Sequence, residues 1–172
     1  MPQPCYLRII GTNQGFITQK AGSHDSIGDK AVEAHQNEIL VQSIGHSVVT
    51  PTDRQSGQPS GQRIHGPLKV TCEINSALPL LYNALCQGEA LESVSLDWYR
   101  MSISGKQEHF FSTSLTNARL SEIQLLLPDS REDKASNTNQ FVNLFFNYRK
   151  IEWVHHMAST YGVDDWRRPV EA

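Results

Sequence analysis

Apolar and polar residues alternate along much of the chain with a period of two, which is the pattern of half-buried β-strands. The clearest example is Leu68–Ile74, where the intervening residues Lys69, Thr71 and Glu73 are all polar. Further strands are expected at residues 5–10, 14–20, 27–34, 38–50, 91–103, 108–115, 118–127 and 141–154. The chain is therefore expected to be mainly β.

One amphipathic helix is expected between two of these strands, over about residues 76–87. Three leucines recur at helical spacing on one face, and a proline falls in the first turn, where its missing N–H costs little. Either Asn75 or Ser76 can cap the start of the helix, and Gly88 is a natural stop. The helix is expected to lie on the sheet with its leucine face inward.

Two of the expected strands change their apolar phase part of the way along. In residues 91–103 the apolar positions shift between Trp98 and Tyr99, and in residues 141–154 they shift after Tyr148. Such a shift indicates a bulge, or a strand whose second face also becomes covered. Long strands with apolar groups on both faces favour pairing with another chain, and an ordinary sandwich with bulged strands is the alternative.

Composition narrows the range of partners. The 172 residues suffice for one domain with a substantial core. Lys and Arg number 15 against 18 Asp and Glu, so the formal net charge is −3 and no basic surface for nucleic acid is indicated. No apolar run approaches the ~20 residues of a membrane helix, and the N-terminus lacks the pattern of a signal peptide. We expect a chain made in the cytoplasm that neither binds nucleic acid nor inserts into membranes.

The three cysteines, Cys5, Cys72 and Cys86, are odd in number and show no C-x-x-C spacing. Cys72 and Cys86 fall at apolar positions of an expected strand and helix. All three are therefore expected to be small buried side chains of a protein in a reducing compartment.

Candidate catalytic residues do not converge in the sequence. The seven histidines show no metal-ligand spacing, so neither a metal nor a cofactor is expected. Asp164 and Asp165 are adjacent in a polar tail, residues 158–172, and are expected to be solvated charges. A hydrolase that uses His65 or His109 with a nearby carboxylate is kept as an alternative, although no catalytic set can be drawn.

A long polar excursion spans residues 50–67, between two expected strands. Loops of this length are uncommon in compact domains unless they are functional or disordered. The segment contains glycines and prolines but lacks the G-K-[ST] ending of a phosphate-binding loop, so nucleotide binding is not expected. It is either an arm that reaches a neighbouring molecule or a solvent loop.

The residues of this loop resemble the loop signature of the Hcp (haemolysin-coregulated protein) family, the tube proteins of the bacterial type VI secretion system. Other similar motifs follow in the same order along the chain. The set consists of Pro51-Thr52-Asp53, residues 60–67 (SGQRIHGP), residues 80–88 (LLYNALCQG), Trp98-Tyr99, residues 105–111 (GKQEHFF), residues 148–153 (YRKIEW) and Asp164-Asp165-Trp166. The resemblance is colinear from about residue 4 to the C-terminus.

The resemblance implies a two-sheet β-barrel with one α-helix, similar to phage tail-tube proteins, in a single domain over residues 1–172. It implies homohexameric rings that stack into a tube, with a VgrG-like spike protein, a contractile sheath and small effector proteins in the lumen as partners. The tube would be assembled in the cytoplasm and secreted through the machine without a signal peptide. The chain ends at Ala172, with no room for the toxin domain that some members carry, so enzymatic activity is not expected.

The resemblance also implies that the long loop contacts an adjacent subunit or ring. The loop residues expected at this contact are Pro51, Thr52, Asp53, Ser60, Gly61, Arg63 and His65. The candidates for strands at the subunit interface are Trp98, Tyr99, Met101, Tyr148, Ile151 and Trp153. Asp53 and Arg63 are expected to anchor the loop by charge-assisted hydrogen bonds, within or between subunits. A monomeric β-sandwich that binds a ligand with its loops is the alternative.

Overall fold

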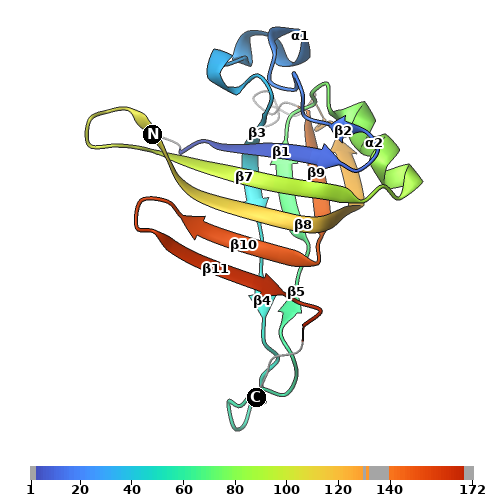
Figure 1. Cartoon of the computed structure of the whole chain (residues 1–172). Helices are drawn as coiled ribbons and strands as arrows, with labels where there is room; N and C mark the ends of the chain where they lie inside the picture. The colour runs from blue at the N-terminus through green and yellow to red at the C-terminus, as the bar shows by residue number, and fades with distance from the viewer. Residues whose placement is uncertain (1–2, 130, 132–139, 169–172) are drawn as a thin grey trace.

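The computed structural model of the chain describes residues 3–129, 131 and 140–168. Strands dominate it, as the alternating pattern predicts, and one helix of three turns accompanies them (Figure 1). In the described residues the elements follow in the order β1 (Cys5–Gly11), β2 (Gly15–Phe16), α1 (His24–Ile27), the 3-10 turns η1 (Gly28–Lys30) and η2 (Glu33–His35), β3 (Ile39–Gly45), β4 (Val48–Val49), β5 (Ile64–His65), β6 (Leu68–Cys72), α2 (Leu78–Gln87), β7 (Leu91–Met101), β8 (Gln107–Leu126), β9 (Phe141–Asn147), β10 (Lys150–His155) and β11 (Thr160–Asp165).

The main sheet closes on itself into an antiparallel barrel. Pairing runs from β8 through β7, β1, β3, β6 and β9, and β9 pairs again with β8. The length of β8 makes this closure possible. Its first half pairs with β10, and its second half, from Arg119 onward, pairs with β9. The strands β10 and β11, here called the wing, therefore continue the sheet beyond the closed barrel (Figure 1).

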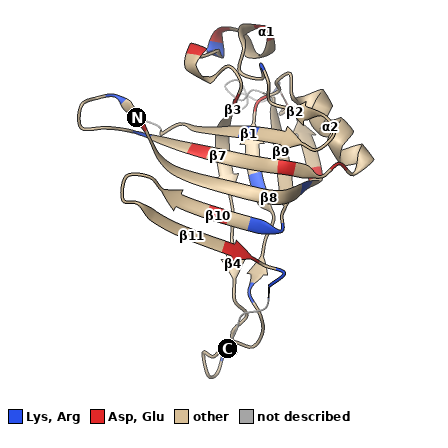
Figure 2. Ribbon diagram, in the orientation of Figure 1, with Lys and Arg blue, Asp and Glu red and all other residues tan. Residues whose placement is uncertain are grey.

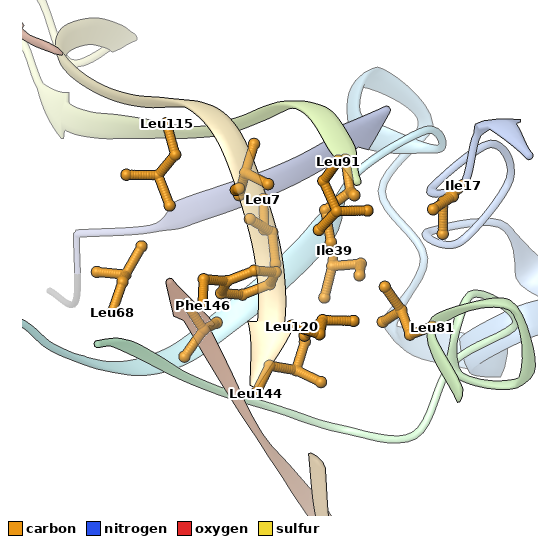
Figure 3. Close-up of a cluster of buried hydrophobic side chains, with 14 of the residues drawn as sticks. Leu7, Ile17, Ile39, Leu68, Leu81, Leu91, Leu115, Leu120, Leu144 and Phe146 are labelled. Atoms are coloured by element: carbon orange, nitrogen blue, oxygen red, sulfur yellow. The ribbon is translucent and has the colours of Figure 1, made fainter. Parts of the chain in front are cut away.

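The interior of the barrel is filled by aliphatic side chains around Phe146, which is fully buried (Figure 3). Phe146 lies on β9, opposite Leu68 of β6 on one side and Leu120 of β8 on the other. The helix α2 packs against β8 and inserts the buried side chain of Leu81. Because alternate residues of each strand point inward, the period-two pattern of the sequence becomes this core.

The helix and one of the two phase shifts are as predicted, but the predicted cap is wrong. Ala77 is the N-cap and has no side-chain cap, because Asn75 Oδ1 accepts from the Ala77 amide in the turn before the helix. Leu78 and Leu81 are buried on the inner face of α2, and Gly88 ends the helix in the left-handed conformation. The register of β7 against β8 shifts between Trp98 and Tyr99, where the apolar phase changes. That shift confirms the predicted bulge.

The second phase shift has a different cause from a bulge. The expected single strand over residues 141–154 is wrong, because the chain leaves the sheet at Tyr148 and divides it into β9 and β10. β9 pairs with β6 and the second half of β8, while β10 pairs with the first half of β8 and with β11. The shift in phase therefore marks the point where the chain passes from the barrel to the wing.

Several other expected boundaries are corrected. Residues 27–34 form no strand, because they hold the end of α1, the turn η1 and the start of η2, and Gly28 ends α1 with a positive φ of 67°. Only Gly15–Phe16 of the expected strand at 14–20 is extended. The segments 108–115 and 118–127 form the single strand β8, and residues 38–50 divide into β3 and β4.

Two predictions concern segments that are described in part. The segment 158–172, expected to be a polar tail, contains the strand β11, and its residues 169–172 lie outside the described residues. The polar loop at 128–140 also falls largely outside them. Among the described residues, neither helix has the length and apolar character needed to cross a membrane.

The cysteines are free, and they differ in exposure. Cys5 and Cys72 are buried, as expected, whereas Cys86 is exposed, which corrects its prediction. Burial raises the pKa of Cys5 and of Cys72 to about 12, so both are held as neutral thiols.

Candidate functional site

The long excursion between β3 and β6 is a hairpin arm, defined here as residues 46–66. β4 pairs with β5 at its base, and an isolated bridge joins Thr52 to Pro59 nearer the tip. The tip is closed by backbone hydrogen bonds from Asp53 to Gln58 and from Gly57 to Asp53, both 2.8 Å. The arm projects away from the barrel at the end where β11 finishes (Figure 1). It is therefore an ordered ribbon rather than an irregular loop.

A carboxylate on the wing holds the base of this arm. Asp164 of β11 accepts two hydrogen bonds from Arg63, at 2.7 Å from Nε and 2.8 Å from Nη2, and one from His65 Nε2 at 2.6 Å. Arg63 also donates to the carbonyl oxygens of Asp165 and Arg168, both at 3.0 Å. Figure 2 shows the acidic end of β11 beside the base of the arm, where Arg63 binds Asp164. The hydrogen bonds from Arg63 hold the pKa of Asp164 below its usual value.

A tyrosine hydroxyl links the same arm to the barrel. Tyr148 Oη lies 2.7 Å from His65 Nδ1 and 2.7 Å from His46 Nε2. Burial, and then the nearby Asp164 carboxylate, raise the pKa of Tyr148, so its hydroxyl stays protonated. The two strands of the arm are thus both tied to the residue where β9 ends and the wing begins.

The outer edge of the wing is open in the single chain. The backbone amide of Trp166 donates to the carbonyl of Arg149 at 3.2 Å. In an antiparallel pair, the amides of successive residues point alternately toward the partner strand and away from it. The amides of Gly162 and Asp164 therefore face β10, while that of Val163 points outward. Among the described residues, no strand pairs with this outer edge. Val163 is 47% exposed, so an apolar side chain accompanies an unsatisfied strand edge.

The predicted loop residues divide between the tip and the base of the arm. Those expected at the contact that lie toward the tip are exposed or half-buried, namely Pro51, Thr52, Asp53, Ser60 and Gly61. Asp53 accepts hydrogen bonds from Gln55 and Ser56 of the same tip. Arg63 and His65 bind Asp164 at the base. In the single chain, Asp53 and Arg63 therefore have separate roles and do not form a common anchor.

Most of the residues predicted at the subunit interface pack against this chain's own core. Ile151 is fully buried and Tyr148 is 5% exposed. Trp98 and Trp153 pack at the margin of the core. Tyr99 contacts the rings of Tyr6 and His35 edge-on, and Met101 is exposed. Ile151 and Tyr148 support the wing from inside.

The sequence does not reveal Asp164, His46 or the open edge of β11 as site residues. Asp164 lies 101 residues from Arg63 along the chain, and His46 lies 102 residues from Tyr148. The available signal is the acidic pair at 164–165. In an irregular tail this pair would be solvated, whereas the strand β11 places it beside the arm.

Both histidines considered for hydrolysis do lie near a carboxylate. His65 has both ring nitrogens hydrogen bonded, and its side chain is only 6% exposed. His109 Nε2 lies 3.3 Å from Asp97 and 2.8 Å from the Ser112 hydroxyl. His65 is thus fully engaged in holding the arm. Within the described residues, no group of three or more His, Cys, Asp or Glu side chains is arranged to hold a metal ion.

Asp164→Ala is expected to loosen the arm, because Arg63 and His65 lose their shared carboxylate. The amides of β4 and β5 should then exchange with solvent roughly tenfold faster, as measured by hydrogen exchange. Asp53→Ala is the matched control, since it removes a carboxylate that bonds within the tip. Equal loosening by both substitutions would contradict the assignment of Asp164 as the holding group.

Comparison with known proteins places these features in context. A family model described as "Type VI secretion system effector, Hcp" matches residues 6–155. The "Major exported protein" of Pseudomonas aeruginosa is 41% identical over 170 residues, which covers 99% of each chain.

Solved structures agree with this sequence match. A "Crystal structure of Hcp protein" has a TM-score of 0.91 at 42% identity and covers 98% of this chain and all of the other. The "Secreted protein Hcp3 from Pseudomonas aeruginosa" has a TM-score of 0.82 at 35% identity and covers 97% of this chain and all of the other. The similarity extends over the barrel, the wing and the arm.

Proposed function

The chain belongs to the Hcp family of type VI secretion system proteins, and from this premise we propose that it is a structural subunit of the secretion tube. Six copies would close into a ring, and rings would stack to form the tube. Two similar proteins have "exported" and "secreted" in their names, which supports a protein that leaves the cell.

The open outer edge of β11 carries the proposal of a ring. An exposed strand edge with apolar side chains is a template for another strand, and closure into a ring removes such edges. Head-to-tail contacts that close by rotation form rings. Pairing of this edge with the next copy would leave each wing covered on both sides.

The arm is the proposed contact between rings. Its ribbon presents Val49 at 55% and Ile64 at 58% exposure, and an isolated two-stranded hairpin is only marginally stable without a partner. The tip residues Thr52 and Ser60 would meet the adjacent copy, while Arg63 holds the base of the arm in place.

The remaining interface candidates are proposed to line the sides of the ring. Met101 lies where β7 extends past the start of β1 and is exposed, so it is available to a neighbour, while Tyr99 beside it is half-buried against this chain's own Tyr6 and His35. Trp98 and Trp153 would support the wall from the core side. Tyr148 and Ile151 would act indirectly, by fixing the wing on the barrel.

The proposed partners follow from the family. A VgrG-like spike would cap the tube, a contractile sheath would surround it, and small effector proteins would travel in its lumen. The tube would be assembled in the cytoplasm and driven out by sheath contraction. We propose no catalytic role for the chain, because the His65 ring is fully occupied by structural hydrogen bonds.

Electron microscopy of the purified protein tests this proposal. Rings, alone or stacked into tubes, are expected, with six subunits around the axis. Uniform particles the size of one chain would contradict the proposal and favour a monomeric β-sandwich binding module. The wild-type protein at several concentrations is sufficient, since no substitution is needed to see rings.

A further inference from the structure

A continuous chain of hydrogen bonds crosses the base of the arm. It runs from His46 through the Tyr148 hydroxyl to His65 and ends on Asp164, with separations of 2.7, 2.7 and 2.6 Å. The Tyr148 hydroxyl has one hydrogen to donate, so the protons on the two imidazoles determine the direction of each bond.

With both imidazoles neutral, every member of the chain is satisfied. His65 donates from Nε2 to Asp164 and accepts at Nδ1 from Tyr148, which in turn accepts from Nε2–H of His46. Addition of one proton to His65 reverses the two Tyr148 bonds without breaking them, because Tyr148 then accepts from His65 and donates to a neutral His46. The arrangement therefore tolerates one positive imidazolium.

When the second imidazole is also protonated, no rearrangement of the hydrogen bonds satisfies every group. With both imidazoles charged, Tyr148 faces an N–H donor on each side, and its own hydrogen loses its acceptor. We propose that His46 and His65 form an acid-sensitive latch, which releases the His46 side of the arm from the barrel when both are protonated. The Arg63 side stays bound, because acid strengthens the contact between His65 and the Asp164 carboxylate.

The surrounding charges leave the second imidazolium without a partner. Asp164 already accepts from Arg63, and Asp165 pairs with Arg149 at 3.3 Å and with Arg168 at 3.8 Å. These groups come from β5, from β11 with the residues after it and from the turn before β10. The strands beside β9 also carry charged residues, namely Lys69 on β6 and Arg119 and Glu122 on β8. A second positive charge would therefore meet arginines whose carboxylates are already paired.

Proton linkage gives the direction of the pH effect. Burial lowers the pKa of His46 below its ordinary value of 6.5, and the neighbouring His65 lowers it further. The docked arm consequently binds fewer protons than the released arm, and docking is lost as the pH falls below about 6.5. Each further pH unit weakens docking by up to about tenfold, until His46 is protonated in the docked arm as well.

The latch deepens the proposed function by adding regulation, and only its consequence for stacking rests on that proposal. If the arm joins rings, acid should shorten tubes while rings persist, because the wing edge is not part of the latch. The loosening itself is a property of each subunit.

Hydrogen exchange of the wild-type assembly at pH 7.5 and pH 5.0 tests the latch, with labelling times scaled for the intrinsic effect of pH. The amides of β4 and β5 should lose protection roughly tenfold or more at pH 5.0, while those of β1 remain unchanged. His46→Gln should keep protection at both pH values, because its amide still bonds Tyr148 but takes up no proton. His24→Gln, on the exposed α1 turn, should behave as the wild type. Equal protection of the wild-type arm at both pH values, or acid loosening of His46→Gln, would overturn the latch.

An imidazole NMR titration of the wild-type protein gives a second reading that needs no variant. His46 should titrate below the ordinary histidine pKa of 6.5, and arm protection should fall over the same range. Arm loosening while His46 is still neutral would overturn the latch. Loosening with tube length unchanged would uphold the latch and contradict the proposed stacking role of the arm.

Discussion

Val163→Pro is expected to reduce the assembled protein from about six subunits to single folded chains. The Val163 amide points away from β10, so proline removes a donor from the outer edge of the wing without breaking the ladder with β10. Proline on an edge strand is tolerated when the missing N–H faces outward. A neighbouring strand that pairs with this edge would lose a central hydrogen bond and meet the proline ring.

Sedimentation velocity at equal concentrations measures the effect. Val163→Thr is the matched control, because it keeps both the N–H and the β-branched shape, and it should remain assembled. Circular dichroism checks that both variants keep the strand content of the wild type. A Val163→Pro protein that sediments as the wild-type ring would show that β11 does not join the subunits.

Phe146→Ala is expected to destabilise the chain by about 3–5 kcal/mol, the range for a fully buried phenylalanine. Phe146 is 0% exposed and occupies the seam where β9 closes the barrel between β6 and β8 (Figure 3). Its removal leaves a cavity that does not collapse, because β9 is hydrogen bonded to β6 on one side and to β8 on the other. The midpoint of thermal unfolding should fall by roughly 10 °C.

Phe145→Ala provides the comparison, since Phe145 is adjacent in sequence but faces outward beside Lys69. It should lower the free energy of unfolding by roughly 1 kcal/mol, a typical value for a partly exposed position. Urea unfolding of both variants, under conditions where rings are dissociated, separates the core effect from assembly. Similar losses for the two would contradict the placement of Phe146 in the closing seam.

Local patterns in the sequence predict those parts of the fold that depend on local interactions. The leucine spacing and Gly88 are sufficient for α2, because the amphipathic face and the left-handed stop are encoded within one segment. The bulge at Trp98 is visible because a register shift moves the apolar side chains to the other face. The phase shift at Tyr148 indicates a bulge or a strand covered on both faces, and the break between β9 and β10 is neither, since a change of partner strands leaves the same pattern in the sequence.

The candidate site could be predicted only in part, because its contacts join distant segments. The arm could be recognised as an unusual excursion, and Arg63 as an anchoring residue, from the family resemblance. Asp164 was expected to be solvated, since nothing in the six residues of β11 shows that an arginine lies beside it. His46 gave no signal either, because its partner is a tyrosine hydroxyl set by the path of β9.

Amide exchange of the assembled protein, resolved to single residues along β11, tests the central claim most directly. The outward-facing amides of Tyr161 and Val163 should be protected in the wild type, and the Tyr161 amide should exchange freely in the single chains of Val163→Pro. The account predicts slow exchange at these amides because a strand from the next copy occupies the edge. Free exchange there in the intact assembly would mean that the edge stays open, and would contradict the account.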